Sequence, residues 1–151
     1  MKSFDEFIKR GIVKKQTPQI SRAKDLIEEA ERKEKSLRER IEKIGLKDDN
    51  ANDFVEDCYA ILMSLIRAKL FLEGYGAIGY SAHEAEVSFM QKLSFNESHI
   101  EFMNKLRYFR NGINYYGTKL DKEYAEKVIS FTKENYLKLR KMIDKNIDKN
   151  L

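Results

Sequence analysis

Apolar residues recur every three or four positions along most of this chain, and this spacing constrains its fold more than any other feature. Such a period places apolar side chains on one face of an α-helix. It is clearest over residues 18–44, 97–116 and 121–147. A further helix is predicted over about 52–73, and it is apolar nearly all round from Tyr59 onward, as expected of a central helix. No convincing strand pattern appears. The sequence predicts an all-α fold, an antiparallel up-and-down bundle of four to five main helices.

Capping residues mark where these helices should begin and end. Ser, Thr and Asn side chains accept hydrogen bonds from the free backbone N–H groups of a first helical turn, and proline fits the first helical position. Glycine commonly ends a helix. The glycine-rich segment 74–80 has no lysine followed by Ser or Thr, so it is predicted to be a connector and not a phosphate-binding loop. Helix starts are predicted at Ser3 with Glu6, Thr17 with Pro18, Ser81 with Glu84, and Asn96.

The length of 151 residues fits a single helical domain. Residues 1–16 are predicted to form a short helix and a strap, and residues 145–151 a frayed tail. The longest mainly apolar run, 59–72, is too short and too charged to span a membrane, and the N-terminal residues lack the apolar core of a signal peptide. These features predict a cytoplasmic protein. Cys58 is the only cysteine and is expected to be a buried small hydrophobe.

The segment from Arg110 to Gly117 is the best candidate for a functional site. Arg110 falls on the edge of the face expected to be buried, where an unpaired cation is costly. Arg107 and Asn114 lie one turn to either side of it and complete a polar edge. A guanidinium suits phosphate, and tyrosines can stack on a base. The predicted phosphate- or nucleotide-binding residues are Arg107, Arg110, Asn111, Asn114, Tyr115 and Tyr116.

A purely structural explanation of this segment is also open. Arg110 could pair with an acid of the central helix, Asp53, Glu56 or Asp57, and the tyrosines could be core or interface aromatics. His83 and His99 lack metal-ligand spacing and are interpreted as structural or surface histidines. No metal site and no cofactor are predicted. With a net charge of +4 and no strongly basic segment, generic coating of nucleic acid is not indicated.

Arg110-Asn111, preceded by Leu106-Arg107, resembles the motif of the HEPN family (higher eukaryotes and prokaryotes nucleotide-binding), small helical bundles of this size. The strap 7–15, with Arg22-Ala23-Lys24 and Glu28–Glu31, is similar to archaeal members. The family motif is an arginine, often followed by asparagine, then four to six residues, then histidine. The resemblance implies metal-independent RNA cleavage, a homodimer paired through the motif helix, and for many members a toxin partnered by a small nucleotidyltransferase antitoxin.

The histidine position of that motif falls on Tyr115 or Tyr116. Some partner nucleotidyltransferases modify a tyrosine two residues after the histidine, and the residue there, counted from Tyr115, is Gly117. Histidine exchanges a proton near neutral pH, whereas tyrosine is protonated there and is a poor general base. The sequence therefore supports phosphate binding better than catalysis, and ribonuclease activity is expected to be weak or absent.

Three functions remain open on the sequence. The first is a HEPN-like homodimer that binds nucleotide or RNA and acts with a nucleotidyltransferase partner in a toxin–antitoxin-like pair, without a membrane. The second is a divergent metal-independent endoribonuclease whose catalytic candidates are Arg110, Tyr115 and Tyr116, or an imported His83. The third is a non-catalytic protein-interaction module in which Arg110 is neutralised by a carboxylate and the tyrosines are buried.

Overall fold

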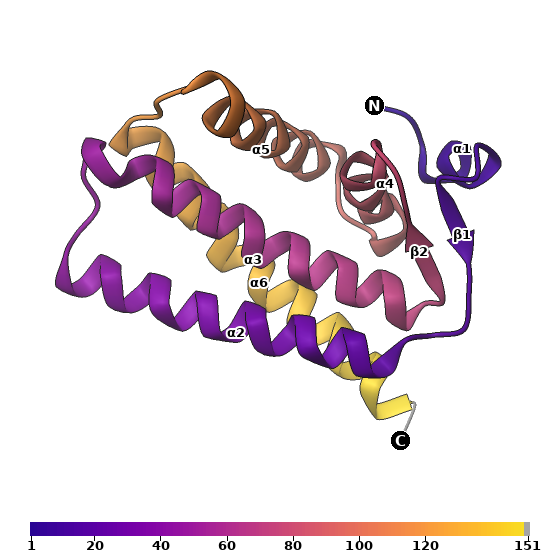
Figure 1. Ribbon diagram of the computed structural model, residues 1–151. Coiled ribbons are helices and arrows are strands. Elements are labelled where there is room, and N and C mark those ends of the chain that lie inside the picture. The colour runs from indigo at the N-terminus through magenta and orange to yellow at the C-terminus, as the bar shows by residue number, and fades with distance from the viewer. Residues whose placement is uncertain (150–151) are drawn as a thin grey trace.

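Helices account for 77% of the computed structural model, which describes residues 1–149, and the predicted all-α class is confirmed. About five main helices pack together beside a small two-stranded sheet (Figure 1). The buried apolar side chains form one core cluster. In chain order the elements are α1 (Phe4–Lys9), β1 (Val13–Lys15), α2 (Ile20–Lys43), η1 (Asp48–Asn50), α3 (Ala51–Leu72), β2 (Tyr75–Ala77), α4 (Ala82–Ser88), η2 (Phe89–Leu93), α5 (Glu97–Tyr116) and α6 (Lys122–Lys149).

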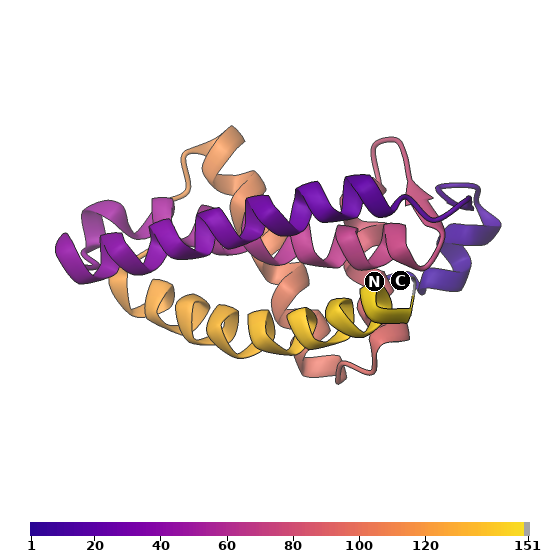
Figure 2. The same ribbon diagram turned by 90° about the horizontal axis from the view of Figure 1, so that it is seen from below.

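The third helix, α3, lies at the centre of the molecule, as the sequence predicts. Nearly every residue from Tyr59 to Leu72 is buried, because α3 packs against α2, α6, α5 and α4. Helices α2, α3 and α6 run lengthwise beside one another (Figure 1). Helix α2 is antiparallel to α3, whereas α6 runs parallel to α3, with Asn52 at the start of α3 hydrogen-bonded to Leu120 just before α6. Helix α5 crosses them steeply when the molecule is seen from below (Figure 2). Its last turns therefore project beyond the long helices, and this end carries the candidate site.

The small sheet corrects the prediction that the chain has no strand and that residues 74–80 are only a connector. Strands β1 and β2 pair antiparallel, with Val13 opposite Ala77 and Lys15 opposite Tyr75. Each has three residues, which is too short to show the alternation by which a strand is recognised. The pairing joins segments about 60 residues apart in the sequence, so it depends on the fold and not on local pattern.

Three of the four predicted helix starts are confirmed, two of them with the expected capping hydrogen bond. The Ser3 hydroxyl accepts a hydrogen bond from the backbone N–H of Glu6, and the Asn96 side chain accepts one from that of His99. The predicted start at Thr17-Pro18 is wrong, because α2 begins at Ile20. Segment 16–19 is instead tied to the end of α3: the Gln16 N–H donates to the Gly74 carbonyl, and the Gln19 N–H donates to that of Phe71. At the third confirmed start, Ser81 is the N-cap residue of α4, but its side chain does not make the predicted capping hydrogen bond.

The C-terminal boundaries follow the sequence closely until the last turn. Helix α5 ends at Tyr116, and Gly117 adopts the left-handed conformation (φ +66°) that glycine tolerates. Helix α6 continues through Lys149, so most of the segment predicted to fray is helical, and residues 150 and 151 lie outside the described residues. Within residues 1–149, no helix combines the length and the apolarity that crossing a bilayer requires.

Candidate anion-binding site

Arg110 lies on the inner side of α5 and is half-buried. Its guanidinium carbon is 5.9 Å from the centre of the Tyr59 ring, which belongs to α3. Over residues 1–149, Arg110 has no carboxylate within ion-pairing distance. A half-buried cation without a counter-charge is unfavourable. Its contact with an aromatic face offsets part of this cost.

The acids proposed as structural partners of Arg110 are engaged elsewhere or stand apart from it. Asp57 pairs with Arg40 of α2. Asp53 is exposed at the start of α3. Glu56 lines the same cavity as Arg110 but does not form an ion pair with it. The structural explanation by pairing is therefore wrong for all three acids.

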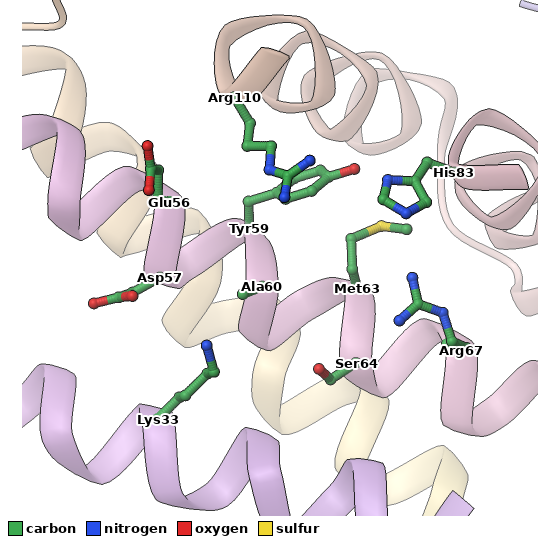
Figure 3. A pocket seen from close by; sticks show the side chains of 10 residues that line it. All are labelled: Lys33, Glu56, Asp57, Tyr59, Ala60, Met63, Ser64, Arg67, His83 and Arg110. Carbon is green, nitrogen blue, oxygen red and sulfur yellow. The ribbon is translucent and has the colours of Figure 1, made fainter. Parts of the chain in front are cut away.

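An inner cavity of about 310 Å³ lies beneath Arg110, between α2, α3, α4 and α5 (Figure 3). This volume is at the lower end of the range for small-molecule sites, about 300–1,000 Å³. Tyr59, Met63 and Arg67 recur every four residues along α3 and form one wall. The lining residues are Lys33, Glu56, Asp57, Tyr59, Ala60, Met63, Ser64, Arg67, His83 and Arg110.

The hydroxyl of Tyr59 is the least expected group in this cavity. Only 4% of the Tyr59 residue surface is exposed, and among residues 1–149 its hydroxyl oxygen has no hydrogen-bond partner. Burial raises the pKa of Tyr59 to about 12, and the nearby positive charges of Arg110 and Arg107 lower it by less. The hydroxyl is therefore protonated across the physiological range and is a donor without an acceptor.

Arg67, two turns after Tyr59 on α3, supplies a second partly buried cation to the cavity. Its Nε donates to Glu86 Oε2, and its second guanidinium nitrogen donates to Oε1 at 3.0 Å. The Glu86 side chain is 5% exposed and that of Arg67 is 28% exposed. This bidentate pair fixes the orientation of the guanidinium and ties α4 to α3.

An outer cavity of about 390 Å³ adjoins the first, on the side of the β2–α4 connection. Arg110 and His83 line both cavities, so the two spaces share these side chains. Tyr80, at the rim, is fully exposed. The lining residues are Gly79, Tyr80, Ser81, His83, Glu84, Arg107, Arg110, Asn111 and Tyr115.

The structure brings together four of the six residues predicted for the site. Arg107, Arg110, Asn111 and Tyr115 line the outer cavity, whereas Asn114 and Tyr116 are exposed and line neither cavity. The side chains of Asn114 and Tyr116 point away from both cavities because each helical residue is rotated by about 100° from the one before it. The tyrosines are not core residues: Tyr115 is 76% exposed and Tyr116 86% exposed.

Arg107 is held by its own helix. Its Nε donates to the Asn104 side chain at 3.0 Å, and its guanidinium carbon is 4.9 Å from the centre of the Tyr108 ring. Neither contact neutralises its charge. Arg107 and Arg110 together give the outer cavity two cations, against the one carboxylate of Glu84 among its lining residues.

His83 is the residue whose position changes the interpretation most. The sequence indicates a structural or surface histidine, yet its ring faces the guanidinium of Arg110 and the Tyr59 ring across the cavity (Figure 3). His83 has an exposed side, but partial desolvation lowers its pKa. The negative charge of Glu86 raises the pKa of His83, and the positive charge of Arg67 lowers it. His83 therefore favours the neutral form at pH 7. The other histidine, His99, packs against the rings of Phe95 and Phe131.

Four contributors to the site, Tyr59, Arg67, Tyr80 and His83, lie outside the segment that the sequence singles out. Only the four-residue repeat of Tyr59, Met63 and Arg67 could have indicated a shared face. The approach of α4 to α5, which brings in His83 and Tyr80, has no local signature. Comparisons with protein-family models, with curated proteins and with solved structures return no match for this chain, so its function is inferred from the site itself.

Proposed function

We propose that this protein binds the phosphates of RNA or of a nucleotide in the two adjoining cavities around Arg110. The observation that carries the proposal comes from the part of the chain that the structure describes: a half-buried guanidinium without a carboxylate partner lies over the ring of a tyrosine whose buried hydroxyl has no acceptor. Both groups are expensive to leave unpaired, and one anion would satisfy both. The rings of Tyr80 and Tyr115 support the proposal because they are exposed beside the outer cavity, and exposed aromatic rings can stack on bases.

The same proposal includes a HEPN-like mode of action. The pair Arg110-Asn111 supports it, as does the exposure of aromatic rings on the last two turns of α5. Tyr108, Tyr115 and Tyr116 are 65%, 76% and 86% exposed. Large exposed aromatics on one helix end favour pairing with another protein surface. In this proposal α5 pairs two protomers, and a nucleotidyltransferase is the partner protein.

The test is direct binding of a fluorescent single-stranded RNA, with fluorescence anisotropy as the readout. We expect Arg110→Ala to weaken binding by roughly 10- to 100-fold, as loss of a charge-assisted contact does. Arg32→Ala is the matched control, since Arg32 is exposed on α2 and pairs with Glu29 of its own helix, outside both cavities. Equal affinity of the Arg110→Ala variant and the parent would overturn the assignment of this site.

A second candidate, metal-independent RNA cleavage, is favoured by the position of His83. In this mechanism the neutral imidazole accepts the proton of a ribose 2′-hydroxyl as that oxygen attacks the adjacent phosphorus, and Arg110 stabilises the charge on the phosphoryl oxygens. The 5′-oxygen leaves and takes a proton from water. The assay is RNA cleavage in the presence of a chelator, comparing the parent with His83→Ala and with Tyr115→Phe/Tyr116→Phe. Cleavage that is lost only in His83→Ala favours this candidate; cleavage that survives in every variant excludes His83 and both tyrosines.

A further inference from the structure

The buried hydroxyl of Tyr59 points to a more specific ligand than RNA in general. A buried donor without an acceptor costs about 1–3 kcal/mol. Phenylalanine at this position would lose no hydrogen bond, because among residues 1–149 the Tyr59 hydroxyl has no hydrogen-bond partner. Phenylalanine is common in this chain, with nine residues. A ligand atom that accepts a hydrogen bond from this hydroxyl would remove the cost of leaving it unpaired.

The donors around this hydroxyl come from three helices. The Arg110 guanidinium lies over the Tyr59 ring, and the Arg67 guanidinium extends toward the cavity from farther along α3 (Figure 3). Arg67 uses two N–H groups on Glu86, and a guanidinium has about five. About three N–H groups of Arg67 are thus left for a ligand. His83, from α4, closes the side of the cavity between the two arginines.

The two carboxylates that line the inner cavity both come from the first half of α3. Glu56 and Asp57 lie toward the start of α3, away from Arg67 and His83 (Figure 3). Asp57 is already paired with Arg40, and both carboxylate oxygens of Glu86 accept from Arg67. The end formed by Tyr59, Arg67 and Arg110 therefore has more donors and more positive charge than the protein itself satisfies.

We infer that this end of the inner cavity is a subsite for a terminal phosphomonoester, the phosphate at an RNA end or on a free nucleotide. A terminal phosphate carries a charge of about −1.5 to −2 at pH 7 and has three strong acceptor oxygens. An internal phosphodiester has one charge and two free oxygens, which would leave part of this donor set unused. The inference rests on the proposed function, because the rest of the ligand occupies the outer cavity that Arg110 and His83 share with the inner one.

The experiment compares RNAs of one sequence and length that carry a 5′-phosphate, a 3′-phosphate or hydroxyls at both ends, with AMP as a free competitor. Affinities are measured by calorimetry for the parent and for Tyr59→Phe. The matched control is Tyr124→Phe, because the Tyr124 hydroxyl is also buried without a partner but lies outside both cavities. Thermal unfolding shows that each variant is folded.

In the parent and in Tyr124→Phe, we expect a phosphorylated end to bind about tenfold more tightly than a hydroxyl end. Tyr59→Phe should lose this preference and retain the affinity for the hydroxyl-ended RNA. The end that is preferred, or strong competition by AMP, identifies the source of the phosphate. Equal affinities for all three RNAs, or a preference that survives in Tyr59→Phe, would overturn the subsite and leave the proposed function intact. Absence of binding by every RNA would overturn both.

Discussion

The Arg67–Glu86 pair should be the most sensitive polar interaction of the fold. It ties α4 to the central helix, and both partners are largely removed from water, with Glu86 more deeply buried than Arg67. Breaking a buried pair by removing one partner costs about 3–5 kcal/mol, chiefly because the remaining charge is left unpaired. The cost should therefore depend on which charge remains.

Arg67→Met leaves the 5%-exposed carboxylate of Glu86 alone, and we expect a loss of about 3 kcal/mol in the free energy of unfolding. Glu86→Gln leaves a guanidinium that is 28% exposed and retains some hydration, so about 1–2 kcal/mol should be lost. The double variant Arg67→Met/Glu86→Leu leaves no charge and should regain most of the stability. Its deficit should be about 1 kcal/mol.

The assay is urea unfolding followed by circular dichroism of the helices, with the free energy extrapolated to zero denaturant. The double-mutant comparison separates the pair energy from the effects of each side chain. Two results would refute the reasoning. One is a larger loss in Glu86→Gln than in Arg67→Met, and the other is a double variant that is as unstable as the sum of the two single variants.

Three further predictions follow from local geometry and burial. Gly117→Ala should lower the free energy of unfolding by about 1 kcal/mol, because Gly117 has a φ of +66°; stability unchanged in thermal or urea unfolding would contradict this. Burial raises the pKa of the Cys58 thiol to about 12. At pH 8, Cys58 should therefore react with a thiol reagent far more slowly in the folded protein than in denaturant. Equal reaction rates would show that the thiol is accessible in the folded protein. Burial lowers the pKa of His83 below 6.5, so the unfolded chain protonates this histidine more readily than the folded protein does. As pH falls from 6.5, the parent should therefore lose more stability than a His83→Gln variant. Parallel curves of stability against pH for the two proteins would refute this.

Much of the fold could be predicted because helices are encoded locally. The apolar stripe of α2 and the all-round apolarity of α3 predict which faces are buried, and Asn96 and Gly117 mark the two ends of α5. Local signals failed where tertiary contacts compete with them. Thr17-Pro18 has the composition of a helix start, but hydrogen bonds to the end of α3 keep this segment extended.

The candidate site likewise contains residues that local sequence signals could predict and residues that only tertiary contacts bring in. Arg110 and its neighbours on α5 could be predicted because one helix displays them together. The partners of these residues could not be predicted, since Tyr59 lies about 50 residues away along the chain and His83 lies on a short helix of its own. Whether Arg110 would meet a carboxylate was equally undetermined, because three acids on α3 were plausible partners. The packing of α5 across α3 gives Arg110 the face of a tyrosine instead.

The sequence by itself determined the helical class, the central position of α3 and the placement of Arg110 on a helix edge, because periodicity depends only on residues a few positions apart. Only the tertiary structure decided that Arg110 has no counter-charge among residues 1–149, that it lies over the ring of a buried tyrosine, and that His83 faces it. These facts depend on how α3, α4 and α5 cross, and packing between distant segments sets that geometry. The same crossing turns a motif on one helix into a pocket with walls from four.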